Sequence, residues 1–217
     1  MILLQETTIQ ITKSETVFDI ILKGGWILVP IVLLSLTALY FIVERYLLFH
    51  SYRSIDKKLI DSICEKIKNK DYNKAKELAK NYTHPIGRII EVGLDNSNRN
   101  INDIEQIMQE EAKSQIFLFE KNLGYIGSIA TIAPMFGFLG TIFGVIKIFY
   151  NISLTDNISI GIIAGGLYQK MVSSAAGLTV GIIAYAGFYY LNTRIDFLVN
   201  LMERELSRVI IALKDSK

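Results

Sequence analysis

Three long stretches of the chain contain no charged residue, and polar sequence separates them. They are residues 24–43, 122–146 and 171–193, and a helix needs roughly 20 apolar residues to cross a hydrocarbon core. Because an open strand cannot satisfy its backbone polar groups in lipid, each stretch is predicted to be a helix. The pattern predicts an all-α polytopic membrane protein with three transmembrane helices.

The polar sequence between the first two stretches also has helical periodicity. Asp71 is a predicted N-cap for a helix that runs through Lys80, and the run Thr-His-Pro at 83–85 separates it from a second helix at 86–94. Asn102 with Glu105 resembles a capping box. The sequence that follows contains no helix breaker, so we expect one continuous helix from there into the second span.

The tail after the third span repeats apolar residues at helical spacing, which predicts that this span continues as an amphipathic helix. The stretch 45–121 and the tail are rich in lysine and arginine, whereas the loop 151–159 has neither. Basic flanks stay on the cytoplasmic side. The expected topology has the N-terminus and that loop outside, with the middle region and the C-terminus inside.

These patterns divide the chain into seven predicted regions. They are an outer-side amphipathic segment (1–23), transmembrane helix 1 (24–46), a cytoplasmic helical region (47–121), transmembrane helix 2 (122–147), an outer-side hairpin with the start of helix 3 (148–169), transmembrane helix 3 (170–193) and a cytoplasmic C-terminal helix (194–217). The apolar faces of so small a chain cannot all be buried within it, which predicts a homo-oligomer.

Composition narrows the function classes. The chain is 51% hydrophobic and 20% charged, which fits a membrane protein with a sizeable aqueous part, and a net charge of +2 gives no indication of nucleic-acid binding. With one cysteine (Cys64) and two histidines (His50 and His84), an intramolecular disulfide is excluded and neither a protein-built metal site nor a cofactor is expected. No arrangement typical of a hydrolase or a transferase lies near a span, so the protein is not expected to be an enzyme.

Small and polar residues interrupt the second and third spans. Glycine permits the close approach through which membrane helices associate, and a proline at membrane depth can be accommodated where neighbouring groups satisfy the freed backbone. The predicted helix-packing residues are Gly137, Gly140, Gly144, Gly177, Gly181 and Pro134. Packing alone would explain this pattern.

Two hydroxyl groups make a second interpretation possible. Thr141 lies six residues inward from Lys147, about 9 Å along a helix, and Ser174 lies four residues inward from Lys170, about 6 Å. Two hydroxyls on antiparallel helices are therefore expected at a similar depth. A structural role, in which each bonds its own helix, remains the alternative.

Four segments of the chain resemble one family. They are GGW with PIVLLSLTALYFIVERYLLF, HPIGRIIEVGL, IGSIATIAPMFGFLGTIFGVIKIF and YQKMVSSAAGLTVGIIAYAGF. The chain is similar to the MotA/TolQ/ExbB proton-channel family, and within it to the ExbB and TolQ branch. The resemblance covers nearly the whole chain, and the last two segments are the most specific.

The resemblance implies a homopentamer around a pore lined by the second and third spans, in the inner membrane of a Gram-negative bacterium. It implies an ExbD- or TolR-like single-span dimer as partner, and a TonB- or TolA-like protein that relays the movement to the outer membrane. Thr141 and Ser174 match the family's two proton-path threonines, the second with a change to serine. Gln169 stands where the family usually has a glutamate, and Lys170 where a small residue is common.

None of the three charge-free stretches contains aspartate or glutamate. Because intramembrane carboxylates usually mark proton relays, a conducting complex would need a carboxylate from a partner. The leading hypothesis is a proton-channel subunit that drives energised transport, with transport of the TonB type as the favoured process. The alternative is a non-conducting scaffold of the same fold. Gln169 favours this alternative, because a neutral amide cannot carry a proton by titration. Lys147 and Lys170 are expected at the pore mouth or the membrane interface, and Lys170 either extends to that interface or guards the pore.

Overall fold

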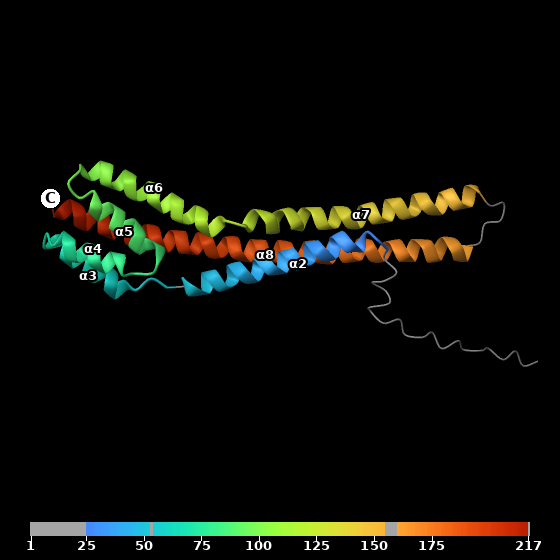
Figure 1. Cartoon of the computed structure of the whole chain (residues 1–217), viewed down its shortest axis with the longest axis horizontal. Helices are drawn as coiled ribbons and strands as arrows, with labels where there is room; N and C mark the ends of the chain where they lie inside the picture. The colour runs from blue at the N-terminus through green and yellow to red at the C-terminus, as the bar shows by residue number, and fades with distance from the viewer. Residues whose placement is uncertain (1–24, 53, 155–159, 217) are drawn as a thin grey trace, which may run out of the picture. The chain divides into compact units, whose positions relative to one another are not determined.

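The computed structural model describes residues 25–52, 54–154 and 160–216. The predicted amphipathic segment 1–23 lies outside the described residues, as does the tip of the predicted outer-side hairpin. The described elements are all helices: α2 (Leu28–Ser51), α3 (Lys57–Lys68), α4 (Tyr72–Lys80), α5 (Pro85–Asp95), α6 (Ile101–Glu120), α7 (Leu123–Ser153) and α8 (Ile160–Asp215) (Figure 1). Three helices, Leu28–Ser51, Leu123–Ser153 and Ile163–Asp215, are long and apolar enough to cross a membrane. The prediction of an all-helical chain with three such helices is confirmed.

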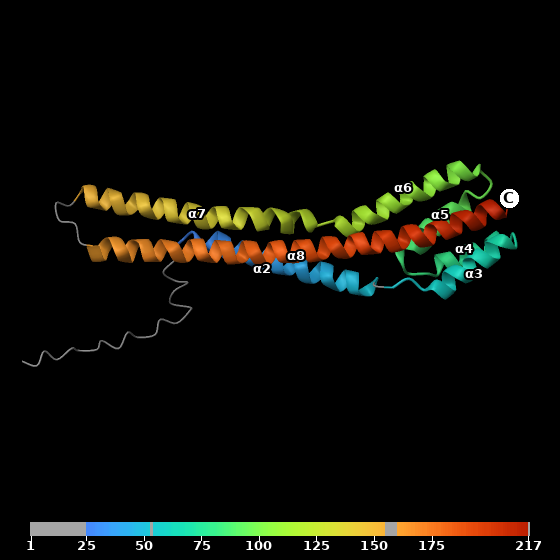
Figure 2. The ribbon, with the colours of Figure 1, turned by 180° about the vertical axis from the view of Figure 1, so that it is seen from behind.

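The chain divides into two compact units, and the three long helices each contribute to both. The first unit contains Met1–Ser35 and Thr131–Ile182, and the second contains Leu36–Ala130 and Ile183–Lys217. In the first unit, α7 runs alongside the beginning of α8 in both views (Figure 1, Figure 2).

The core of the first unit is small and apolar. Ile27, Leu28 and Ile31 are buried, and Phe136, Ala176 and Val180 pack against them. Most of the remaining apolar surface points outward. In the most apolar 18-residue segment of α7, only 28% of the residues are buried. A helix that is apolar on every side but exposed in its own chain is suited to lipid or to further subunits.

The second unit buries the amphipathic faces of α3, α5 and α6. Ile60, Ile63, Ile67, Ile86, Ile89, Ile90 and Ile104 are fully buried. Polar contacts join distant segments at the edge of this core: the Tyr72 and Ser216 hydroxyls lie 3.1 Å apart, and Arg208 pairs with Asp61. These contacts hold the end of α8 against α3 and α4.

The helix starts follow local side-chain chemistry, with one exception to the predictions. Asp71 caps α4 by accepting a hydrogen bond from the Lys74 amide, which confirms that N-cap. The predicted capping box at Asn102 is wrong, because α6 begins at Ile101 and Asn100 is its N-cap. Glu105 accepts a hydrogen bond from Gln109, one turn further along, and does not reach back to the start of the helix.

The expected continuous helix from the polar region into the second span is interrupted. After α6 ends, Lys121 takes an extended conformation and Asn122 has a φ of +70°. Asparagine tolerates this left-handed region better than most residues because its short side chain can bond locally. Here the Asn122 amide donates to the Glu44 carboxylate at 3.2 Å. A tertiary contact thus supports a break that no proline or glycine marks.

The neighbouring Arg45 is 4% exposed and secures the same break. Its guanidinium donates to the Leu118 carbonyl oxygen at 3.2 Å and pairs with Glu44 at 3.2 Å. Leu118 is in the last turn of α6, where helix carbonyls lack intrahelical partners. The dipeptide Glu44-Arg45 of α2 therefore fixes both sides of the junction between α6 and α7.

His84 makes the stability of the second unit dependent on pH. Its imidazole Nδ1 accepts a hydrogen bond from the Ile86 amide at 3.3 Å, as the N-cap of α5, and packs between the rings of Tyr52 and Tyr82. Burial lowers the pKa of His84, and the nearby Tyr52 backbone partly opposes this shift. The folded chain therefore holds a neutral imidazole that the unfolded chain protonates more readily.

We predict that thermal stability falls as the pH drops below about 6.5, the ordinary histidine pKa. Protonation removes the Nδ1 acceptor, and loss of an N-cap costs about 0.5–2 kcal/mol. Melting temperatures of the purified protein at pH 7.5 and pH 5.5 measure the effect. His84→Asn keeps a side chain that can cap the helix but does not titrate, so it should reduce the difference between the two melting temperatures. His50→Asn should leave that difference unchanged. An equal pH response in the wild type and in His84→Asn would contradict this assignment.

Candidate functional site

The helices α7 and α8 approach each other closely at a point where both lack side chains. A β-carbon added to Gly177 would lie 2.6 Å from the Ala133 carbonyl oxygen and 2.9 Å from the Gly137 Cα. One added to Gly137 would lie 3.0 Å from the Ser173 carbonyl oxygen. The neighbours are backbone atoms, which cannot move aside cheaply. We call this contact between Gly137 and Gly177 the glycine seam.

Beside the glycine seam, two other glycines of α7 accommodate side chains from α8. A β-carbon at Gly140 would lie 2.6 Å from the Ser173 hydroxyl oxygen, and Ser173 is fully buried. One at Gly144 would overlap the methylene groups of Lys170. The predicted packing residues therefore differ in what they contact inside the chain. Pro134 lies within α7, next to the buried Ala133, and Gly181 is buried one turn beyond Gly177.

The hydroxyl groups near the glycine seam differ in their hydrogen bonding. Thr141 donates to the Phe138 carbonyl oxygen at 2.6 Å, and Ser173 donates to the Lys170 carbonyl oxygen at 2.8 Å. Such bonds to the preceding turn are common for hydroxyls in membrane helices. The partly buried Ser174 side chain forms no hydrogen bond with any described residue. Its hydroxyl is available to water or to another chain.

The register of the two helices sets the depth of the predicted pathway residues. Ser174 is opposite Gly137, since a β-carbon there would lie 3.1 Å from the Ser174 Cα. Thr141 is four residues further along α7, about 6 Å at 1.5 Å per residue. The two hydroxyls are thus about one turn apart in depth, with the Ser173 hydroxyl against the glycine just before Thr141. Gln169 belongs to α8, and its side chain lies outside the described part of the chain.

The lysines mark the same end of both helices. Lys147 is exposed, and the stem of Lys170 crosses Gly144. The Lys170 ammonium nitrogen is 3.8 Å from the position of a β-carbon at Gly25, shortly before α2 begins. The adjacent Trp26 is 75% exposed, as is typical of an aromatic residue at a membrane interface. This geometry suits an ammonium group that extends toward the interface while its stem remains among apolar groups.

The site offers hydroxyl and amine groups but no carboxylate of its own. The stretches 122–146 and 171–193 contain no aspartate or glutamate. Within the described ranges, no group of three or more histidine, cysteine, aspartate or glutamate residues could hold a metal ion. The hydroxyls beside the glycine seam can therefore supply hydrogen bonds, while a titrating group would have to enter from outside the chain.

Sequence reasoning did not single out Ser173 or the junction formed by Glu44, Arg45 and Asn122. Ser173 is adjacent to Ser174, and the sequence alone does not show which of the two turns toward α7. For the junction, the signal was present in Asn122, which follows a lysine and can adopt positive φ, but its partner is 78 residues away. These are long-range contacts that a local pattern does not specify.

The fold and the seam define a helical membrane protein in which small residues and the Ser173 hydroxyl lie between α7 and α8. The family model for the MotA/TolQ/ExbB proton channel family matches residues 81–204, more than half of the chain. The chain belongs to this family.

Relatives place it on the ExbB and TolQ branch. An ExbB homologue from Methanothermobacter thermautotrophicus is 25% identical over 192 residues, which are 87% of this chain and 67% of that protein. The biopolymer transport protein ExbB of Neisseria gonorrhoeae is 28% identical over 162 residues, covering 73% of this chain and 66% of the relative. An ExbB-like protein of Synechocystis is 26% identical over 182 residues, which are 82% of this chain and 71% of that protein.

The glycine seam predicts opposite effects for two alanine substitutions in α8. Gly177→Ala places a methyl group against backbone atoms and should destabilise the fold by about 1–3 kcal/mol, as overpacking does. Gly165→Ala meets no atom within 4 Å and should be neutral, or stabilise the helix by about 0.5–1 kcal/mol. Melting temperatures of the two purified variants provide the comparison. If Gly177→Ala melts like the wild type, the helices do not approach as described.

Proposed function

We propose that the protein is an inner-membrane proton-channel subunit that, with a single-span ExbD- or TolR-like partner, converts the proton motive force into mechanical work. The work would be delivered to the outer membrane through a TonB- or TolA-like protein, with TonB-type energised transport as the foremost use. The family match carries the proposal, because residues 81–204 include both spans of the glycine seam. The names of the relatives, biopolymer transport proteins, support the same assignment.

The exposed apolar surface supports an oligomer in this function. On α7, Met135, Phe138 and Phe143 are each more than half exposed, and so is Met171 on α8. A homopentamer would bury part of this surface between neighbouring copies and leave the rest to lipid. The second and third spans would then surround a central pore that holds the partner's helix. The predicted polar region would form helices on the cytoplasmic side of this assembly.

The proposed orientation has the N-terminus in the periplasm and the C-terminus in the cytoplasm of a Gram-negative bacterium. Lysine and arginine are abundant in the stretch 45–121 and after residue 193, which are the flanks that this orientation places inside. The protons would then enter at the end of α7 and α8 where Lys147 and Lys170 lie, and would leave toward the junction of α6 and α7.

The proposed mechanism divides the chemistry between two proteins. An aspartate from the partner's membrane helix would take up and release the proton, since the uncharged stretches 24–43, 122–146 and 171–193 of this chain contain no carboxylate. Thr141 and Ser174 would bind water or that carboxylate. A hydroxyl both donates and accepts a hydrogen bond, and that of Ser174 has no partner among the described residues. Gln169 would contribute an amide at the outer end of the path, where it can orient water but cannot titrate.

Proton flux through proteoliposomes that contain the subunit and its partner tests the proposal. Thr141→Val retains the shape but removes a hydroxyl, and should reduce the flux by about fivefold, because one hydrogen bond contributes about 1 kcal/mol. Thr179→Val is the matched control, since Thr179 is exposed and bonds the Ala175 carbonyl oxygen in the same manner. No flux from the wild-type complex would favour a scaffold. Equal flux from wild type and Thr141→Val would place the path elsewhere.

Lys170 is expected to be an interfacial residue and not a gate. Its stem crosses Gly144 toward the start of α2, so Lys170→Gln should leave the proton leak of the complex within about twofold of the wild type. An isolated lysine at the centre of a membrane costs at least about 2.5 kcal/mol, which favours an ammonium outside the hydrocarbon. Leak is compared at equal protein density, with Lys147→Gln as the control. A large rise for Lys170→Gln alone would mean that this lysine guards the pore.

A further inference from the structure

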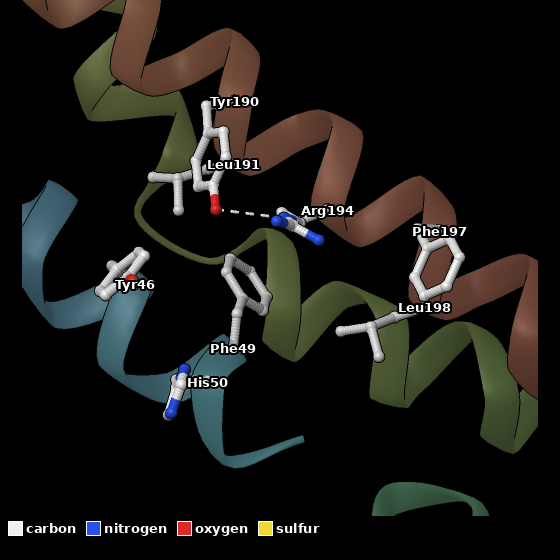
Figure 3. A pocket seen from close by; sticks show the side chains of 8 residues that line it. All are labelled: Tyr46, Phe49, His50, Tyr190, Leu191, Arg194, Phe197 and Leu198. Carbon is white, nitrogen blue, oxygen red and sulfur yellow. Dashed lines mark hydrogen bonds between the residues drawn. The ribbon is translucent and has the colours of Figure 1, made fainter. Parts of the chain in front are cut away.

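A cavity of about 330 Å³ lies in the second unit between the end of α2 and the middle of α8 (Figure 3). From α2 it is lined by Tyr46, Phe49 and His50, and from α8 by Tyr190, Leu191 and Arg194, among others. Its size is at the lower end of the range for small-molecule sites. Aromatic and aliphatic side chains form most of the wall, and the guanidinium and the imidazole are its two nitrogen-rich groups.

The position of Arg194 in the cavity is fixed by one aromatic residue. Its Nε donates to the Tyr190 hydroxyl at 3.2 Å, shown as the dashed line in Figure 3, and its guanidinium carbon is 5.1 Å from the centre of the Tyr190 ring. Tyr46 lies against the same ring, with the two centres 6.5 Å apart. The guanidinium is therefore held over an aromatic surface, while its two terminal amino groups form no hydrogen bond with any described residue.

Ion pairing distinguishes Arg194 from four other arginines of the second unit. Arg88, Arg204 and Arg208 each pair with a glutamate of their own helix, and the buried Arg45 pairs with Glu44. No ion pair is found for Arg194 among the residues that the structure describes, and its side chain is exposed. An accessible guanidinium without a carboxylate is suited to an external anion, which it can bind with two parallel hydrogen bonds.

The sequence places this cavity at a membrane boundary. Arg194 is the first charged residue after the uncharged stretch 171–193, and His50 is in the last turn of α2. At such a boundary the hydrocarbon ends and the phosphate groups of the lipids begin. Basic pockets between membrane helices at this level bind the headgroups of anionic lipids.

We propose that this cavity binds an anionic glycerophospholipid from the leaflet at that end of the spans. The lipid phosphate binds the Arg194 guanidinium next to the His50 imidazole, and the start of an acyl chain lies against Phe49 and Leu191. Charge selects an anionic over a zwitterionic headgroup, because a choline group would bring a second positive charge beside Arg194. The aromatic and aliphatic walls select a lipid over a soluble phosphate. This inference depends on membrane insertion and not on proton conduction.

Native mass spectrometry of the purified full-length protein, stripped of lipid in detergent, tests the site. Dioleoylphosphatidylglycerol is the probe, with dioleoylphosphatidylcholine and glycerol 3-phosphate as comparisons. We expect retained phosphatidylglycerol on the wild type and at least tenfold weaker binding to Arg194→Gln, with Arg194→Lys between them. The choline lipid should bind as weakly to the wild type as to Arg194→Gln, and glycerol 3-phosphate should not compete with phosphatidylglycerol.

Lys121→Gln is the matched control, because it removes one positive charge from the same boundary without touching the cavity. Its affinity for phosphatidylglycerol should stay within twofold of the wild type. Equal losses for Lys121→Gln and Arg194→Gln would overturn the site in favour of general attraction to charge. Competition by glycerol 3-phosphate would overturn the lipid as the occupant. Unchanged phosphatidylglycerol binding by Arg194→Gln would also overturn the proposal, and the cavity would then have another occupant, for example a second copy of the chain. Melting temperatures without lipid verify that each variant is folded.

Discussion

The contact between Gly137 and Gly177 determines how α7 and α8 are arranged in the first unit. At this point the backbones touch, with less room than a single methyl group on Gly177 would need. In lipid, two apolar helices gain little from leaving their solvent, so close packing and interhelical hydrogen bonds have to hold them together. Once the two glycines are in contact, the register of both helices is fixed over the turns on either side.

That register decides which polar groups come together. It places Ser173 against Gly140 and the stem of Lys170 across Gly144, with Ser174 opposite Gly137. A shift of one residue would turn each of these side chains by about 100° around its helix. The hydroxyls of a proposed proton path thus depend on residues that have no side-chain chemistry. A close glycine contact also leaves little freedom for the helices to slide, so movement in a working complex would more easily occur between chains than within this pair.

Hydropathy and capping chemistry predicted much of the fold because they are local. An uncharged run of the right length can satisfy its backbone in lipid only as a helix, so the three spanning helices followed from the sequence. The cap at Asp71 was predictable for the same reason, since an aspartate side chain reaches the amides just after it. The small-residue faces of α7 and α8 were also visible as patterns.

The break between α6 and α7 shows where local reasoning ends. An asparagine between a lysine and a leucine does not terminate a helix by itself. The Glu44 carboxylate supports the left-handed conformation of Asn122, and Arg45 donates a hydrogen bond to a carbonyl group at the end of α6. Both residues belong to a helix that is far away in the sequence. The candidate site has the same limitation. The sequence singled out Ser174, but only the packed helices show that the neighbouring Ser173 is buried against Gly140.

The two glycine pairs of the first unit illustrate how one sequence pattern serves two physical purposes. Gly140 and Gly144 have the spacing of a helix-packing motif, as Gly177 and Gly181 do. Gly177 faces backbone atoms, whereas Gly144 faces the flexible methylene groups of Lys170. A larger residue at Gly144 could be accommodated by a different lysine conformation, but a larger residue at Gly177 would have to separate the helices. The glycine at 144 therefore provides room for a charged side chain to pass along the helix surface, and the glycine at 177 provides the contact that holds the helices together.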